Sequence, residues 1–257
     1  MAFLAHRNFI YSIISVLKYR HLKALYYIFR VIKSPISFLY IYLTGKGDFP
    51  RVVIVRTPMG TASINTFNYH DILTVNEVFC RFDYKSDEKD RVIVDVGSNI
   101  GVSALYFLTR SASSFCFLYE PNPMCIERMK ENLAKFTGRY KLIEAAVSDV
   151  DGFVEFGIES TGRYGGIGLS RDSMIKVECR SINSVLNEVL VEYDFVDVLK
   201  IDTEGAELRT LMSVKDEYLS RIKRVYIEDI VSEKIHEDLF AQKQYGTIYQ
   251  LTNRKCS

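Results

Sequence analysis

The sequence predicts an α/β fold in which a mostly parallel β-sheet carries helices on both faces. Short apolar runs alternate with helical patterns between residues 92 and 201, which is typical of parallel strands joined by right-handed crossovers. The apolar strand 92–96 runs into a glycine turn and then a helix, and the apolar strand 196–201 ends in a cluster of acidic residues. Because ligands bind beyond the carboxyl ends of strands in such sheets, these two ends are the expected site.

A hairpin and a helix precede this sheet in the sequence. Residues 49–66 hold β-branched residues on both sides of the turn Thr57-Pro58-Met59-Gly60, which indicates two short strands. A helix is expected from Asp71, because apolar residues then recur on one face and an acidic residue stands near the start. The polar run 83–91 leads into the first strand of the sheet.

The rest of the chain alternates between the two periods of secondary structure. Pro121 and Pro123 end one strand and favour a helix after them. The expected elements are a helix at 102–109, a strand at 115–120, a helix at 124–136, strands at 141–145, 153–158 and 175–180, a helix at 181–192 and a strand at 196–201. After residue 228 we expect one helix, 232–242, and one strand, 247–251, which leave little room for a complete hairpin at that sheet edge.

Charge is distributed unevenly along the 257 residues. Residues 1–47 carry seven Lys and Arg and no Asp or Glu, whereas the remaining 26 basic and 32 acidic residues give the body a net charge of −6. A nucleic-acid substrate usually meets a basic face on the catalytic body, so no nucleic-acid partner is expected. The sequence therefore divides into a basic, aromatic-rich helical segment at 1–47, a hairpin and cap helix at 48–90, and the ligand-binding domain at 91–257.

Two interpretations of the segment 1–47 remain open. Its longest charge-free run, 34–45, is too short to cross a bilayer, which takes about 20 apolar residues. The segment either lies in the headgroup region, where its cations meet anionic lipid, or packs on the body or a second subunit. The membrane interpretation predicts a cytoplasmic protein peripheral to the inner face of the membrane. Five cysteines without a C-x-x-C pair also favour a reducing compartment.

The glycine turn after the strand 92–96 indicates a nucleoside ligand. Glu120, at the end of the next strand, is positioned to accept both hydroxyls of a ribose. Gly97 and Gly101 remain from the dinucleotide pattern, but Asn99 replaces its middle glycine and disfavours a pyrophosphate cofactor. S-adenosylmethionine has no phosphate, and Asp95 with the turn backbone could hold its amino-acid end. The alternative is that the glycines only pack a helix on the sheet.

Further acidic residues complete the expected site. Asp149 follows a short apolar run and is placed to accept a hydrogen bond from an exocyclic amine such as that of adenine, or else only closes a turn. Asp202 and Glu204 follow the strand 196–201, so Asp202 is the first candidate for a general base. Alternatively, both could hold a divalent cation that acidifies a hydroxyl. Glu207 is expected to play a structural role at the start of a helix.

Three ordered motifs resemble those of FkbM-type methyltransferases. They are DVGSNIG at 95–101, YEPNP at 119–123 and LKIDTEGAE at 199–207, and the resemblance extends over residues 50–230. It implies a Rossmann-like class I methyltransferase sheet, preceded here by a helical and hairpin extension. It further implies S-adenosylmethionine-dependent transfer of a methyl group to a hydroxyl of a glycan or glycolipid, as in polysaccharide biosynthesis.

Two other functions remain open beside the one that this resemblance implies. One is an NAD-dependent sugar oxidoreductase, against which Asn99 argues. The other is a non-catalytic, membrane-associated binding protein that keeps the same sheet. A comparison of S-adenosylmethionine binding with NAD binding distinguishes a methyltransferase from the oxidoreductase. Detection of a methylated product distinguishes it from the non-catalytic binding protein.

Overall fold

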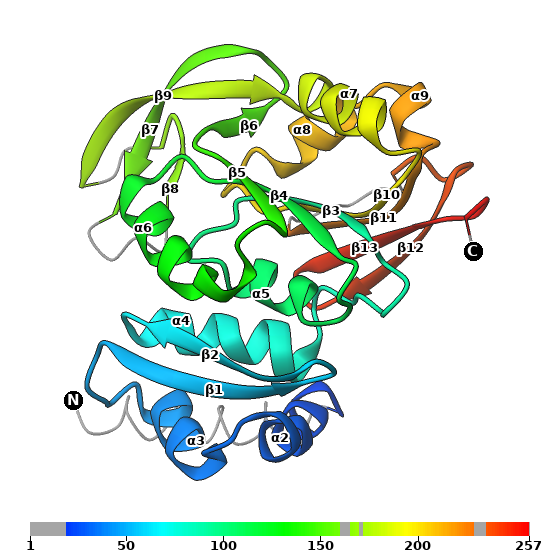
Figure 1. The fold of residues 1–257 in the computed structure, drawn as a ribbon. Coiled ribbons are helices and arrows are strands. Elements are labelled where there is room, and N and C mark those ends of the chain that lie inside the picture. The colour runs from blue at the N-terminus through cyan, green and yellow to red at the C-terminus, as the bar shows by residue number, and fades with distance from the viewer. Residues whose placement is uncertain (1–18, 160–164, 170–171, 229–234, 257) are drawn as a thin grey trace, which may run out of the picture. The chain divides into compact units, whose positions relative to one another are not determined.

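The fold consists of two compact units, residues 1–83 and 84–257. The computed structural model describes residues 19–159, 165–169, 172–228 and 235–256 (Figure 1). Each unit has its own buried residues and is described by itself. Among the described residues, no helix is long and apolar enough to cross a membrane.

The first unit combines helices with one β-hairpin. Its elements are α2 (Tyr19–Val31), α3 (Pro35–Thr44), β1 (Arg51–Thr57), β2 (Gly60–Thr66), α4 (Tyr69–Val75) and the π-helix η1 (Asn76–Arg81). The expected hairpin is confirmed, since β1 and β2 pair antiparallel from Arg51 opposite Thr66 to Thr57 opposite Gly60. The expected helix begins at Tyr69, because Asn68 accepts from the Asp71 amide and Asp71 accepts from the Asn68 amide.

The second unit contains the expected mostly parallel sheet. Seven strands lie in the order β12-β13-β11-β10-β3-β4-β5. The parallel strands are β3 (Val92–Val96), β4 (Phe115–Tyr119), β5 (Tyr140–Ile143), β10 (Val196–Ile201) and β11 (Ile222–Glu228). Helices α5 (Val102–Leu108) and α6 (Pro123–Asn132) cover one face, with the short η2 (Ala134–Phe136) after them. Helices α7 (Ile182–Glu192), α8 (Glu207–Met212) and α9 (Asp216–Leu219) cover the other (Figure 1).

Strand β3 shows how the two faces differ. All five of its residues are buried, as expected for a parallel strand that is covered on both sides. Val92, Val94 and Val96 join the apolar core that includes α7. Because side chains alternate along a strand, Asp95 lies on the other face, where Ser103 of α5 donates to it.

A second, smaller sheet contains two of the predicted strands. Its order is β6-β9-β7-β8, with β6 (Ala146–Ser148), β7 (Gly152–Ile158), β8 (Gly165–Ile167) and β9 (Ser173–Ser181). Strand β7 pairs antiparallel with β9 along its whole length. Strand β6 pairs parallel with the end of β9. The strands expected at 153–158 and 175–180 are thus confirmed, but outside the main sheet.

The helix expected at 232–242 is wrong for its described part, and 232–234 lie outside the described residues. A turn in which Leu239 and Phe240 donate to the His236 carbonyl leads into strand β12 (Phe240–Tyr245). This strand pairs antiparallel with β13 (Ile248–Asn253), which pairs antiparallel with β11. A short amphipathic run fits either period, and pairing with β13 satisfies the backbone here. The edge hairpin that the sequence left little room for is therefore complete.

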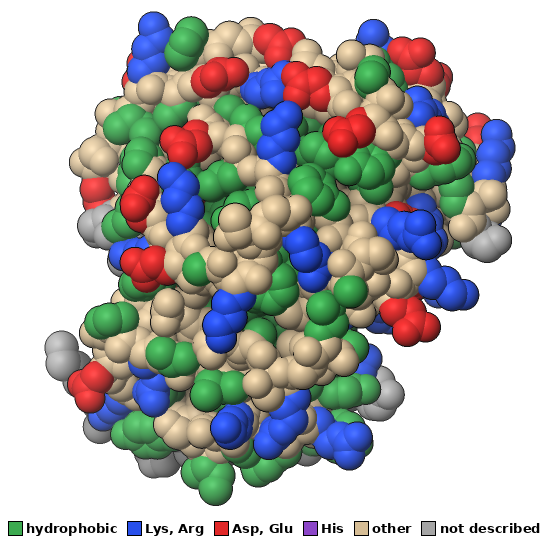
Figure 2. Space-filling view, in the orientation of Figure 1, with side chains coloured by type: hydrophobic (Ala, Val, Ile, Leu, Met, Phe, Trp, Pro, Cys, Tyr) green, Lys and Arg blue, Asp and Glu red, His purple; other side chains and the backbone are tan. Residues whose placement is uncertain are grey.

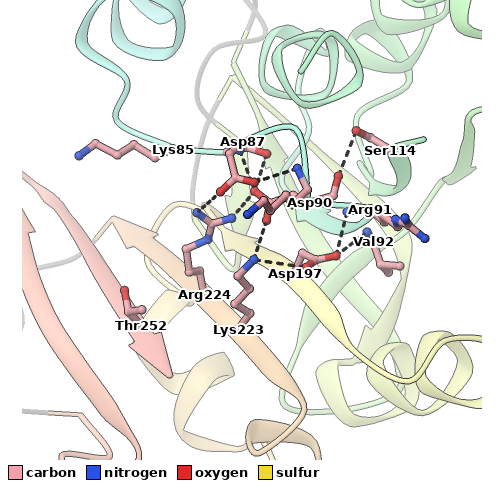
Figure 3. A network of polar contacts seen from close by, with 12 residues as sticks. Lys85, Asp87, Asp90, Arg91, Val92, Ser114, Asp197, Lys223, Arg224 and Thr252 are labelled. Atoms are coloured by element: carbon pink, nitrogen blue, oxygen red, sulfur yellow. Dashed lines mark hydrogen bonds and ion pairs between the residues drawn. The ribbon is translucent and has the colours of Figure 1, made fainter. Parts of the chain in front are cut away.

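A buried network of charges holds the amino ends of the central strands (Figure 3). The fully buried carboxylate of Asp90 forms an ion pair with Arg224 and lies 3.2 Å from the Lys223 ammonium. It also accepts from the Ser86 hydroxyl and the Asp87 amide, each at 2.9 Å. The network thus ties the segment before β3 to β11, at the sheet edge opposite to the carboxyl ends.

We expect Asp90→Asn to lower the free energy of unfolding by about 3 kcal/mol, because it leaves largely buried cations without their counter-charge. The matched control is Asp87→Asn, since Asp87 is 53% exposed and lies 3.7 Å from Arg224. A surface pair of that kind contributes less than about 1 kcal/mol. Urea unfolding measures the free energy of unfolding of both variants. Equal losses of this free energy would contradict the role given to Asp90.

Candidate functional site

The site begins where the glycine turn after β3 meets the loop after β10. Gly97 has φ +77°, and a Cβ built on it would lie 1.8 Å from the backbone carbonyl oxygen of Asp202. The Asp202 amide in turn donates to the Val96 carbonyl at 3.1 Å. Only glycine combines this conformation with so close an approach, so the two strand ends form one continuous backbone surface.

Glu120 fastens the same turn to the end of β4. Its Oε2 accepts from the Asn99 amide at 2.8 Å and its Oε1 accepts from the Asn122 amide at 3.0 Å. The side chain is buried, and burial raises the pKa of Glu120 to about 7 although both amides oppose the shift. Each carboxylate oxygen can accept a second hydrogen bond. Glu120 therefore lies where the sequence predicted it and has acceptor capacity left for a ligand.

Lys200, which the sequence analysis did not select, lies at the centre of the site. Its buried ammonium is 3.0 Å from Asp95 Oδ1 and 3.3 Å from Asp202 Oδ2. It also donates to the Gly97 carbonyl at 2.9 Å. Burial alone would lower the pKa of Lys200, but the charges of Asp95 and Asp202 outweigh it and raise the pKa. The ammonium therefore stays charged and joins the turn, β3 and the β10 loop.

Two further side chains complete this arrangement. The Tyr84 hydroxyl donates to Asp202 Oδ2 at 3.2 Å, and its ring lies 5.3 Å from the Lys200 ammonium, within cation–π range. The Ser103 hydroxyl donates to Asp95 Oδ2 at 2.6 Å. Both described polar contacts of the Asp202 side chain thus fall on Oδ2.

The loop after Asp202 is shaped by its own acidic residues. Glu207 is buried and accepts from the Thr203 and Gly205 amides, each at 2.8 Å. It thus has the structural role expected for it. Glu204 has φ +56°, a left-handed conformation that is uncommon for a residue with a side chain. Its backbone carbonyl lies against Gly166 of β8, where an added Cβ would come within 3.0 Å. The small sheet therefore borders this loop.

Two of the expected residues are placed apart from the Lys200 cluster. Asp149 follows β6, where the Ser148 hydroxyl donates to its Oδ1 at 2.8 Å and Arg209 lies at 3.2 Å. The Ser148 hydrogen bond and then Arg209 hold the pKa of Asp149 below its ordinary value. At Gly101 an added Cβ would meet Met129 Cγ at 2.8 Å. This glycine therefore allows α5 and α6 to pack, whatever it contributes to ligand binding.

The positive charge beside Asp202 is the ammonium of Lys200. Among the residues that the structure describes, no group of three or more His, Cys, Asp or Glu could hold a metal ion. Asp202 and Glu204 were the expected ligands, and the described ion pair of Asp202 is with Lys200. Nothing in this arrangement favours the divalent cation that the sequence analysis considered.

One sequence signal could have revealed Lys200. A lysine inside the apolar run Val-Asp-Val-Leu-Lys-Ile-Asp must find a partner, since an unpaired buried charge is costly. The period of two places Lys200 and Asp202 on one face. Its other partner, Asp95, depends on the register of β10 against β3, in which Lys200 stands opposite Asp95. The roles of Tyr84 and Ser103 carry no comparable local signal.

The fold defines a Rossmann-like α/β protein, and its candidate site lies at the carboxyl edge of the sheet. The family model described as "Methyltransferase FkbM domain" matches residues 95–255. The chain therefore belongs to the FkbM methyltransferase family, and the resemblance seen in the sequence is confirmed.

Several known proteins are similar to this chain. The 2-O-methyltransferase NoeI of Sinorhizobium fredii is 28% identical in an alignment that covers 55% of this chain and 64% of NoeI. The hexuronic acid methyltransferase AglP of Haloferax volcanii is 31% identical over 48% of this chain and 50% of AglP. A solved FkbM methyltransferase from Methylobacillus flagellatus KT is 12% identical with a TM-score of 0.45, over 86% of this chain and 59% of that one. The chain thus spans half to two thirds of these relatives.

We expect Lys200→Met to lower the free energy of unfolding by about 3–5 kcal/mol, because it leaves the buried Asp95 carboxylate without a counter-charge. The double variant Lys200→Met/Asp95→Asn should recover much of that loss, since it removes both charges. Urea unfolding of the wild type, both single variants and the double variant measures the coupling. Additive losses would show that the two charges do not interact.

Proposed function

We propose that this chain transfers a methyl group from S-adenosylmethionine to a hydroxyl, and that the acceptor is a sugar of a glycan or glycolipid. The observation that carries the proposal is the junction of Gly97, Glu120 and Asp202 at one sheet edge in a chain of the FkbM family. The hydroxyls of a ribose donate hydrogen bonds to a carboxylate such as that of Glu120, and Gly97 lets the β3 turn lie directly against the loop that carries Asp202.

The residues present fit this cofactor. Glu120 would accept hydrogen bonds from the ribose hydroxyls. The turn backbone around Gly97 would hold the amino-acid end, together with the charge pair of Asp95 and Lys200. Asn99 takes the position where a middle glycine would admit a pyrophosphate, which supports S-adenosylmethionine over NAD. Gly101 and Asp149 stay candidates for further contacts with it. When bound, the cofactor supplies an already activated methyl group.

The residues of the chain then position the acceptor hydroxyl and remove its proton. Asp202 is the proposed base, because Lys200 and Tyr84 bind its Oδ2 and so orient its Oδ1. Glu204 is proposed to bind the acceptor from the neighbouring position of the loop. NoeI is a 2-O-methyltransferase and AglP is a hexuronic acid methyltransferase, which supports oxygen as the methylated atom and a sugar acid as an acceptor to test.

The proposed compartment is the cytoplasm. All five cysteines are free thiols, which supports a reducing environment. The proposal for Asp202 and Glu204 includes no metal ion, because Lys200 already supplies the positive charge beside Asp202.

The binding of S-adenosylmethionine should weaken below pH 7. The pKa of Glu120 is raised from 4.5 to about 7. Protonated Glu120 therefore stabilises the folded protein without ligand, fully below pH 4.5, and this stabilisation is lost as the pH rises through 7. Ribose hydroxyls favour the ionised carboxylate, so binding releases a proton and its affinity falls by up to about tenfold per pH unit below 7. Calorimetry from pH 5 to 8 measures this.

Glu120→Gln is the matched control for the pH effect. It keeps the shape and one acceptor oxygen but has no proton to lose, so its affinity should be lower at pH 8 and nearly independent of pH. NAD should bind neither protein. Tighter binding of NAD than of S-adenosylmethionine would favour an oxidoreductase and reject the proposed cofactor.

Asp202→Asn and Glu204→Gly should both slow methyl transfer, by about 100-fold for Asp202 if it removes the proton. Glycine adopts the left-handed conformation of residue 204 freely, so Glu204→Gly should unfold no more easily than the wild type. Transfer to oligosaccharides that contain a hexuronic acid is followed by mass spectrometry of the product. A variant that turns over like the wild type would show that its residue has no role in the mechanism. Unchanged cofactor binding would show that a slower transfer does not result from misfolding.

A further inference from the structure

We propose that helices α2 and α3 form a surface that binds the headgroup region of anionic membranes. Six large apolar side chains on these two helices are between 47% and 76% exposed. They are Leu22, Tyr26 and Phe29 on α2, and Ile36, Tyr40 and Leu43 on α3. Of the fourteen large apolar side chains exposed among the described residues, these six fall within 22 consecutive positions.

The spacing shows that the exposed side chains form stripes. On each helix they stand four and then three residues apart, which places them on one face. The first unit does not need that face for its own core, because Ala24 and Ile28 of α2 and Phe38 and Ile41 of α3 are buried instead. Each helix is therefore apolar on two faces, and one of them is open to an external partner.

Charge selects lipid as that partner. Arg30 and Lys33 are exposed beside the α2 stripe, and the Arg30 guanidinium lies 5.9 Å from the Tyr26 ring. Residues 1–47 contain no Asp or Glu. Figure 2 shows basic and apolar side chains intermingled over these helices. Cations and aromatic rings on one face are what an anionic headgroup layer attracts, whereas a protein-binding patch typically has few charges at its centre.

The dimensions of the helices favour binding in the plane of the membrane. Helix α2 has 13 residues and α3 has 10, fewer than the about 20 apolar residues that span a bilayer. The turn between them contains Lys33, and Pro35 begins α3. The proposal does not depend on the reaction catalysed by the second unit. It would bring that unit close to acceptors carried on lipid.

Vesicle flotation of the full-length chain tests the surface. We expect the protein to float with vesicles of phosphatidylcholine and phosphatidylglycerol, and to stay at the bottom with phosphatidylcholine alone or at high salt. Arg30→Gln and Lys33→Gln should each lower the partition coefficient about fivefold, which corresponds to about 1 kcal/mol per cation near an anionic surface. These exposed substitutions leave the core of the unit unchanged.

The apolar contribution is tested by Phe29→Ser/Ile36→Ser, which should lower partitioning by about tenfold or more. The matched control is Val191→Ser/Phe195→Ser, since both residues are exposed apolar positions of the second unit, and it should float like the wild type. Absence of flotation at low salt overturns the proposal. Wild-type flotation of both the charge and the apolar variants also overturns it. If the apolar pair instead converts a dimer into a monomer in solution, the face joins copies of the chain and the lipid assignment is wrong.

Discussion

The candidate site depends on one buried ammonium. Lys200 contacts the carboxylates of Asp95 and Asp202 and the carbonyl oxygen of Gly97, which belong to β3, the loop after β10 and the turn between β3 and α5. Without this positive charge, two carboxylates would stand close together in a region of low dielectric, where their repulsion is strong. With it, the turn and the loop can approach so closely that only glycine fits at position 97. The shape of the candidate site is thus a consequence of charge pairing.

Both edges of the sheet carry buried ionic groups, but they differ in what they leave accessible. At the amino edge, Asp90 is fully buried, and its side chain contacts Lys223 and Arg224 of β11 and the segment before β3 (Figure 3). At the carboxyl edge, the Asp202 side chain is 29% exposed, and its neighbour Glu204 has a left-handed backbone. Strained or partly exposed charged residues gather at functional sites. The first edge therefore holds the strands in place, and the second leaves charged groups of the candidate site partly accessible.

The two units offer separate chemistry. The second unit holds the candidate site and the sequence match to the FkbM domain. The first unit has apolar stripes and an excess of cations, neither of which bears on methyl transfer. An enzyme that modifies lipid-carried sugars gains from such a division, because concentration at a surface raises the encounter rate without altering the site.

The sequence by itself determined the class of fold, the order of strands β3, β4, β5 and β10 with the helices α5, α6 and α7 between them, and the identity of the carboxylates at the strand ends. These follow from local periodicity and from motifs shorter than ten residues, which the chain carries whatever its tertiary contacts. It misassigned residues 235–242, because so short an amphipathic run fits a helix or an edge strand equally well. The partners of Lys200 were decided only in the tertiary structure. Asp95 and Tyr84 are more than a hundred positions away along the chain, and the register of parallel strands, which no local pattern encodes, brings Lys200 opposite Asp95.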